Sequence, residues 1–117
     1  MLVSTTSNIE GRKIKEYCGV VFGEVVNGID FIKDFTANLA NYMGGRSEEY
    51  EQEIIDARAD AITEMTERAK KIGADAVIGV KVDYEPMSMG ENSGGMLMVV
   101  ASGTAVILEN NNKVGKE

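Results

Sequence analysis

The chain has 117 residues, a formal net charge of −7, a hydrophobic share of 44% and an aromatic share of 6% without tryptophan. This length suffices for one compact domain but not for two ordinary ones. Its acidic balance, with the basic residues scattered along the chain, argues against nucleic acid or an anionic membrane surface as a partner, because both need a concentrated positive field.

The cellular compartment can be inferred from three negative features. The single Cys18 excludes an intrachain disulfide and is typical of a reducing compartment. The first residues, MLVSTTSNIEG, lack the basic and apolar segments of a secretion signal. No apolar run approaches the roughly 20 residues that a membrane helix needs. The sequence therefore predicts a soluble cytoplasmic protein.

The first part of the chain predicts two strands and a short helix. Residues 1–5 suit a short strand, and residues 13–26 suit a longer one. Within the longer strand, Gly19 and Gly23 mark a bulge or a close approach of another backbone. Residues 30–42 favour a helix because four large side chains have helical spacing: Phe31, Phe35, Leu39 and Tyr42.

A long amphipathic helix follows. Ser47 suits its N-cap, and Gly73 suits the left-handed residue just after its end. Acidic residues crowd the first turns and basic residues the last, as the helix dipole favours. One apolar stripe is expected to be buried: Tyr50, Ile54, Ala57, Ala61, Met65, Ala69 and Ile72.

Two further strands complete the fold, with a Gly- and Asn-rich hairpin loop between them. In the first, alternation places one set of side chains on a single face: Ala76, Ile78, Val80, Val82 and Tyr84. The second, residues 96–108, is apolar on both faces and needs a covering layer on each. Because the helix supplies only one layer, another copy of the chain is expected to supply the other.

These elements predict an α+β protein with a single domain over residues 1–109 and a polar C-terminal tail, residues 110–117, that is expected to fray. A small antiparallel sheet would pack on one long helix plus a shorter helix. The partner that the residues predict is the chain itself, in a homo-oligomer.

Four segments, in this order, resemble the YbjQ-like family of small bacterial and archaeal proteins, which carries a heavy-metal-binding description: TTSNIEGRKIKEYCGVVFGEVVNG, GGRSEEYE, GADAVIGVKVDYE and GGMLMVVASGTAV. The resemblance spans residues 1–108. It implies an α+β subunit assembled into a ring-like homopentamer, and it implies no established biochemical activity. The metal-binding description must therefore be compared with the residues of this chain.

Ligands for a metal ion are few, since the chain has no histidine and one thiol. A soft ion such as Cu(I) could bind thioether and thiol sulfur, and five residues are the candidates: Cys18, Met87, Met89, Met96 and Met98. The alternative is that these methionines are adaptable packing at a subunit contact. Asp83 and Glu85 could hold a hard ion, but paired carboxylates on a wet strand face usually only face solvent. A ring would repeat each of these ligands around its axis.

Catalysis has little support in the sequence. Cys18 could act as a nucleophile, but its apolar strand suits a buried, inert thiol. Residues 44–47 could hold an anion at the helix start, although the acidic Glu48 and Glu49 follow at once and a simple capping loop explains them. The residues favour a binding or scaffolding protein with a soft metal ion as the candidate ligand. The alternative is an enzyme or small-molecule binder that uses clefts at subunit interfaces.

Overall fold

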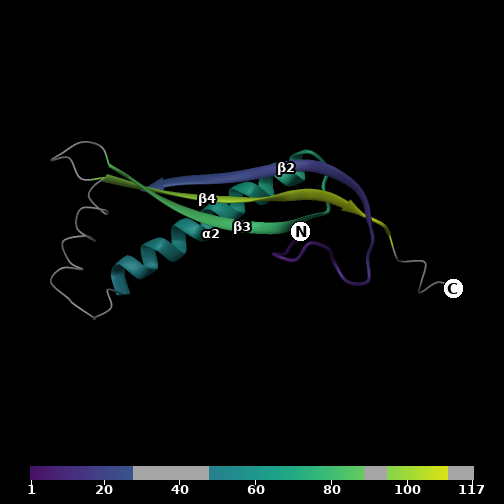
Figure 1. Ribbon diagram of the computed structural model, residues 1–117, viewed down its shortest axis with the longest axis horizontal. Helices are drawn as coiled ribbons and strands as arrows, with labels where there is room; N and C mark the ends of the chain where they lie inside the picture. Colours follow the sequence, from purple (N-terminus) through teal and green to yellow (C-terminus); the bar gives the residue numbers. More distant parts are fainter. Residues whose placement is uncertain (28–47, 89–94, 111–117) are drawn as a thin grey trace.

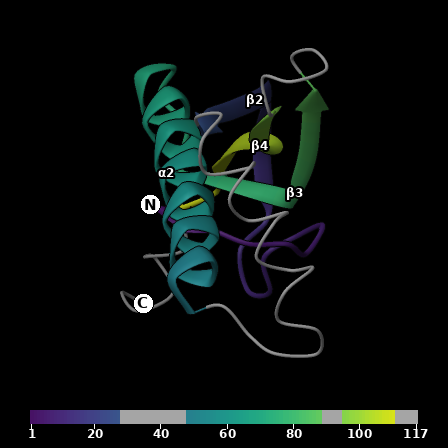
Figure 2. The same cartoon turned by 90° about the vertical axis from the view of Figure 1, so that its left-hand side faces the viewer.

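The computed structural model describes residues 1–27, 48–88 and 95–110. It contains one helix, α2 (Glu48–Lys71), and four strands, β1 (Leu2–Val3), β2 (Ile14–Asn27), β3 (Ala76–Ser88) and β4 (Gly95–Leu108). The strands form one sheet in the order β1-β3-β4-β2, with α2 across one face (Figures 1 and 2). The fold is therefore α+β with two layers, as predicted.

Strand pairing confirms most of the predicted sheet. The three long strands pair antiparallel, with β4 in the middle. β1 is the exception, because it pairs parallel to β3, so the sheet is mixed and the prediction of a wholly antiparallel sheet was wrong. The predicted helix over residues 30–42 and the N-cap Ser47 lie outside the described residues. No helix in the described part of the chain combines the length and apolarity needed to cross a membrane.

The end of α2 confirms the predicted role of Gly73. Its φ is +85°, and its N–H donates to the Lys70 carbonyl at 3.0 Å. The Ala74 N–H donates to the Ala69 carbonyl at 3.1 Å. These two bonds are the Schellman pattern, which requires a left-handed residue at position 73. The chain then turns directly into β3.

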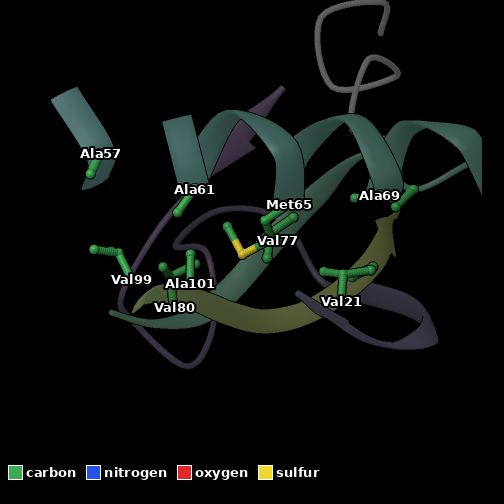
Figure 3. Close-up of a cluster of buried hydrophobic side chains, with 11 residues drawn as sticks. Val21, Ala57, Ala61, Met65, Ala69, Val77, Val80, Val99 and Ala101 are labelled. Carbon is green, nitrogen blue, oxygen red and sulfur yellow. The ribbon is translucent and has the colours of Figure 1, made fainter. Parts of the chain in front are cut away.

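A helix-side cluster of buried side chains joins α2 to the sheet (Figure 3). From the helix it contains Ala57, Ala61, Met65 and Ala69, which confirms the centre of the predicted stripe. From the sheet it contains Val21, Val77, Val80, Val99, Ala101 and Ala105. The prediction was wrong for Ile72, which is 51% exposed because the helix ends one residue before it.

A bulge in β3 changes which face its side chains occupy. The register shifts between Ile78 and Lys81, where two residues of β3 lie opposite Gly103 alone, and Gly79 has a φ of +61°. Before the bulge, Ala76 and Ile78 point away from the helix; after it, Val80 and Val82 pack on the helix side. The predicted strict alternation from Ala76 to Tyr84 was therefore wrong, because one extra residue reverses the parity.

The N-terminal segment holds this bulge and covers part of the second face. The Gly79 N–H donates to the Thr6 carbonyl at 2.8 Å, and the Val80 N–H donates to the Ser4 carbonyl at 3.1 Å. A second cluster lies beneath this segment on the side away from α2, formed by Ala76, Ile78, Val106 and Leu108 with Ile9 and Ile14 packed against it. The rest of that side has no covering layer among the described residues.

Candidate functional site

The open face, which we define as the side of the sheet away from α2, carries a row of exposed apolar side chains on β2. The register fixes their direction: Val20, Phe22 and Val26 alternate with Val21 and Val25, which pack in the helix-side cluster. A bulge at Gly19, with a φ of +120°, keeps Tyr17 on the open face as well. We call these four residues the β2 strip; their exposed fractions are 68% (Tyr17), 65% (Val20), 45% (Phe22) and 51% (Val26).

The sequence placed the uncovered apolar surface on residues 96–108, whereas the structure places its most exposed part on β2. On β4, the open-face residues Met98 and Val100 are only half-buried, and Val99 and Ala101 are fully buried against the helix. The alternating apolar residues in VVFGEVV were the available signal. Their exposure could not be predicted because the sequence does not show that β2 lies at the edge of the sheet.

Charged residues occupy the far side of the open face. Lys81, Asp83 and Glu85 of β3 lie beside Ser102, Val100 and Met98 of β4, respectively. Asp83 and Glu85 are exposed, and no group of three potential His, Cys, Asp or Glu ligands occurs among the described residues. The open face thus changes from charged on β3 to apolar on β2.

The candidate sulfur ligands lie in two separate places. Met87 and Met96 are directly opposed in the β3–β4 register, and Met96 and Met98 are half-buried on β4. Met89 lies outside the described residues. Cys18 lies in the β2 bulge, opposite Ala105 and Val106, where it packs against the helix-side cluster. Since Met98 and Ala105 are seven residues apart on β4, roughly 23 Å separates the two places. Among the described residues, one subunit therefore does not bring Cys18 to Met87, Met96 or Met98.

The outer edge of β2 is occupied by side chains from α2. The Glu24 N–H donates to Glu64 Oε1 at 3.0 Å, and Arg68 Nη1 donates to the Phe22 carbonyl at 2.7 Å. Arg68 also pairs with Glu24 Oε1 and Glu64 Oε2, each at 2.9 Å. The hydrogen bond that Arg68 donates to the Glu24 carboxylate raises the pKa of Arg68, and the charges of Glu64 and Glu24 add to the effect. Arg68 therefore stays positively charged at any working pH.

A surface depression of about 570 Å³ lies between the N-terminal turn and the start of β2. Arg12 lines it and is anchored by Nε and Nη2, which donate to the Glu109 carbonyl at 3.3 and 3.2 Å. Lys13, Glu10 and the exposed ring of Tyr17 also line it. This mixture of charges with an aromatic ring could accommodate a small polar ligand.

Comparisons with known proteins assign this two-layer α+β chain to a family. Residues 1–109 match the model of the YbjQ family, described as "Putative heavy-metal-binding". A UPF0145 protein of Acetivibrio thermocellus is 57% identical over 109 residues, which is 93% of this chain and 100% of that protein. UPF0145 proteins of Listeria monocytogenes and Listeria innocua are also 57% identical over 109 residues, 93% of this chain and 96% of each relative.

A solved structure is similar in fold. It is a protein of unknown function from Pediococcus pentosaceus, assigned to the DUF74 family, with a TM-score of 0.55 and 16% identity over 93% of this chain and 98% of the other. At this identity the likeness concerns the fold alone. The chain belongs to the YbjQ family, and its curated relatives bear the name UPF0145. Membership of this family confirms the resemblance that the four sequence segments indicated.

Proposed function

We propose that this chain acts in the cytoplasm as a homo-oligomer, a ring-like pentamer by family resemblance, with a binding or scaffolding role and a soft metal ion as its ligand. The observation that carries the metal assignment is the register that sets Met87 opposite Met96, with Met98 two residues further along the open face. The heavy-metal-binding description of the family model supports the same class of ligand.

The methionine register suits a soft ion for geometric and chemical reasons. Residues opposed in an antiparallel pair have Cα atoms about 4.5–5.5 Å apart, which is close enough for long side chains to share one ion. Thioethers select soft ions such as Cu(I) over Ca²⁺ or Mg²⁺. Since Met96 and Met98 are half-buried, they combine access for an ion with partial shielding from water. An oligomer would multiply the number of such sites.

The test is copper binding under reducing conditions. Wild-type protein is titrated with Cu(I) against a competing chelator, and the bound metal is measured after dialysis. The Met96→Leu/Met98→Leu double variant should lose the metal because leucine keeps the volume but has no sulfur. Met65→Leu is the matched control, since Met65 is fully buried in the helix-side cluster. Cys18→Ser tests the distant thiol. A wild-type protein without stoichiometric copper would overturn the metal assignment, as would retention of copper by the double variant.

The second candidate is an enzyme or small-molecule binder that uses a cleft at a subunit interface. The depression beside Arg12 and Lys13 supports it, because Tyr17 belongs both to this depression and to the β2 strip. A copy packed on the strip would deepen the depression into a cleft. Arg12→Ala should then weaken binding of a small organic anion to the oligomer. If calorimetry with a panel of such anions detects no binding, this candidate is wrong.

A further inference from the structure

The β2 strip is kept free of charge by an ion pair at the edge of the sheet. Glu24 lies two residues from both Phe22 and Val26, so its backbone position belongs to the same row. Its carboxylate, however, bonds to Arg68 at 2.9 Å, and Arg68 comes from α2 on the opposite side of the sheet. The carboxylate is therefore held at the strand edge. Depletion of charge at the centre and polar groups at the margin are typical of protein interfaces.

The size of the strip suits the centre of an interface. At the exposed fractions given above, two aromatic and two valine side chains leave on the order of 400 Å² of apolar surface in water. Patches of this size on a monomer often mark an interaction site. A standard interface buries about 800 Å² per partner, a little over half of it apolar. The strip supplies that apolar share, while Ser102, Thr104 and the charged row on β3 can supply a polar rim.

The surroundings of the strip restrict how a partner can approach and what it can be. Glu64 and Arg68 occupy the backbone N–H and carbonyl groups at the middle of the β2 edge, so a partner cannot add a strand there. It must pack on the face. Asp83 and Glu85 on this face, together with the net charge of −7 on the chain, would repel an anionic lipid or a nucleic acid. These two classes of partner are therefore excluded.

We infer that the β2 strip is the surface on which a second copy of this chain docks. This inference rests on the homo-oligomer of the proposed function and names the face that forms it. Every copy carries the same uncharged apolar patch, and burial against a neighbouring copy removes it from water without placing a charge at its centre. The Glu24–Arg68 pair then has two roles. It keeps the Glu24 carboxylate off the strip, and it helps to block strand addition at the edge of β2.

Sedimentation of single-lysine variants tests the inference. Phe22→Lys should raise the dissociation constant of the assembly roughly 30-fold or more, the effect expected for a central interface residue. Val20→Lys, at a more exposed position, should do the same with less risk to folding. Ile72→Lys is the matched control, because Ile72 is 51% exposed but lies at the end of α2, outside the strip. Circular dichroism confirms that each variant is folded.

The outcomes separate this inference from the proposed function. A wild-type protein that is monomeric in solution would overturn both the homo-oligomer and the docking surface. This would hold even if a different molecule were found to bind the β2 strip. An oligomer that persists in folded Phe22→Lys and Val20→Lys variants would overturn the docking surface alone. If both variants dissociate and Ile72→Lys does not, the surface is established. The copper measurement on the wild-type protein decides the metal assignment independently.

Discussion

Gly23 of β2 lies directly against the backbone of Ala61 in α2. A Cβ atom on residue 23 would overlap the Ala61 carbonyl oxygen and lie 2.6 Å from the Met65 nitrogen. Both contacts are with backbone, which cannot rotate away. Alanine at positions 57, 61 and 69 extends this close approach along the helix, because small side chains let the two layers meet. The separation of helix and sheet thus depends on one glycine.

Gly23→Ala should therefore be one of the most destabilising single-methyl additions in this chain. We expect a loss of about 3 kcal/mol in the free energy of unfolding, the upper part of the range for overpacking. Gly19→Ala is the matched control, since a Cβ there meets nothing within 4 Å and only its φ of +120° is unfavourable. The control should lose about 1 kcal/mol. Urea denaturation measures both, and equal losses would contradict the close packing.

Gly73→Ala tests the end of α2. The left-handed backbone at this position disfavours a Cβ atom, so we expect a loss of about 1 kcal/mol. Because Cβ addition there meets no atom within 4 Å, the cost is conformational and not steric. Gly73→Asn should lose less, since asparagine tolerates the left-handed region better. Thermal unfolding compares the three proteins, and the same melting temperature for all of them would mean that this conformation is not required.

The glycines show how far the sequence could predict the fold. Gly19, Gly23 and Gly73 were predicted from their positions in apolar patterns, and the structure confirms a bulge, a close approach and a helix end. Gly79 was assigned only to the alternation of its strand. The bulge at Gly79 places Val80 and Val82 on the face opposite to the predicted one. Side chains of a strand alternate between its two faces, so one extra residue reverses the face of every residue after it. A glycine marks an irregularity, but the direction of the change depends on the partner strand.

The candidate site was less predictable for a related reason. The sequence identified methionines with the spacing of one strand face, and the register then added the opposition of Met87 and Met96. It could not place Cys18 relative to them, since that separation depends on which strands pair. The exposure of the β2 strip likewise follows from strand order, with β2 at the edge and the N-terminal segment covering only the other end of the face. Strand order is a tertiary property with no local signal.

Removing Glu64 should open the edge of β2. Its carboxylate accepts the Glu24 N–H, and none of the described strands pairs with β2 on that side. In Glu64→Ala, hydrogen exchange at the Glu24 amide should accelerate, and the protein should aggregate more readily because a strand edge is exposed. Glu67→Ala is the control, since Glu67 pairs with Lys70 on the helix surface and is 59% exposed. Unchanged exchange at Glu24 would show that the helix side chain does not protect this edge.

Val99 and Val100 lie on opposite faces of β4, so a lysine at each position in turn tests the two faces separately. Val99 is fully buried in the helix-side cluster, where a lysine ammonium would have neither water nor a partner. The cost of burying such a charge is several kcal/mol, so Val99→Lys should leave the chain unfolded. Val100 is half-buried on the open face, between Asp83 of β3 and Glu24 of β2.

A lysine at position 100 would meet the Asp83 carboxylate on the open face, which favours the folded subunit, whereas Arg68 holds the Glu24 carboxylate at the strand edge. The same charge would lie beside the β2 strip and disfavour a covering copy. Val100→Lys should therefore keep its circular dichroism spectrum while its sedimentation coefficient falls to that of a monomer. A folded Val99→Lys protein would contradict the burial on the helix side. A Val100→Lys protein that keeps the wild-type assembly would mean that β4 contributes nothing to the contact between copies.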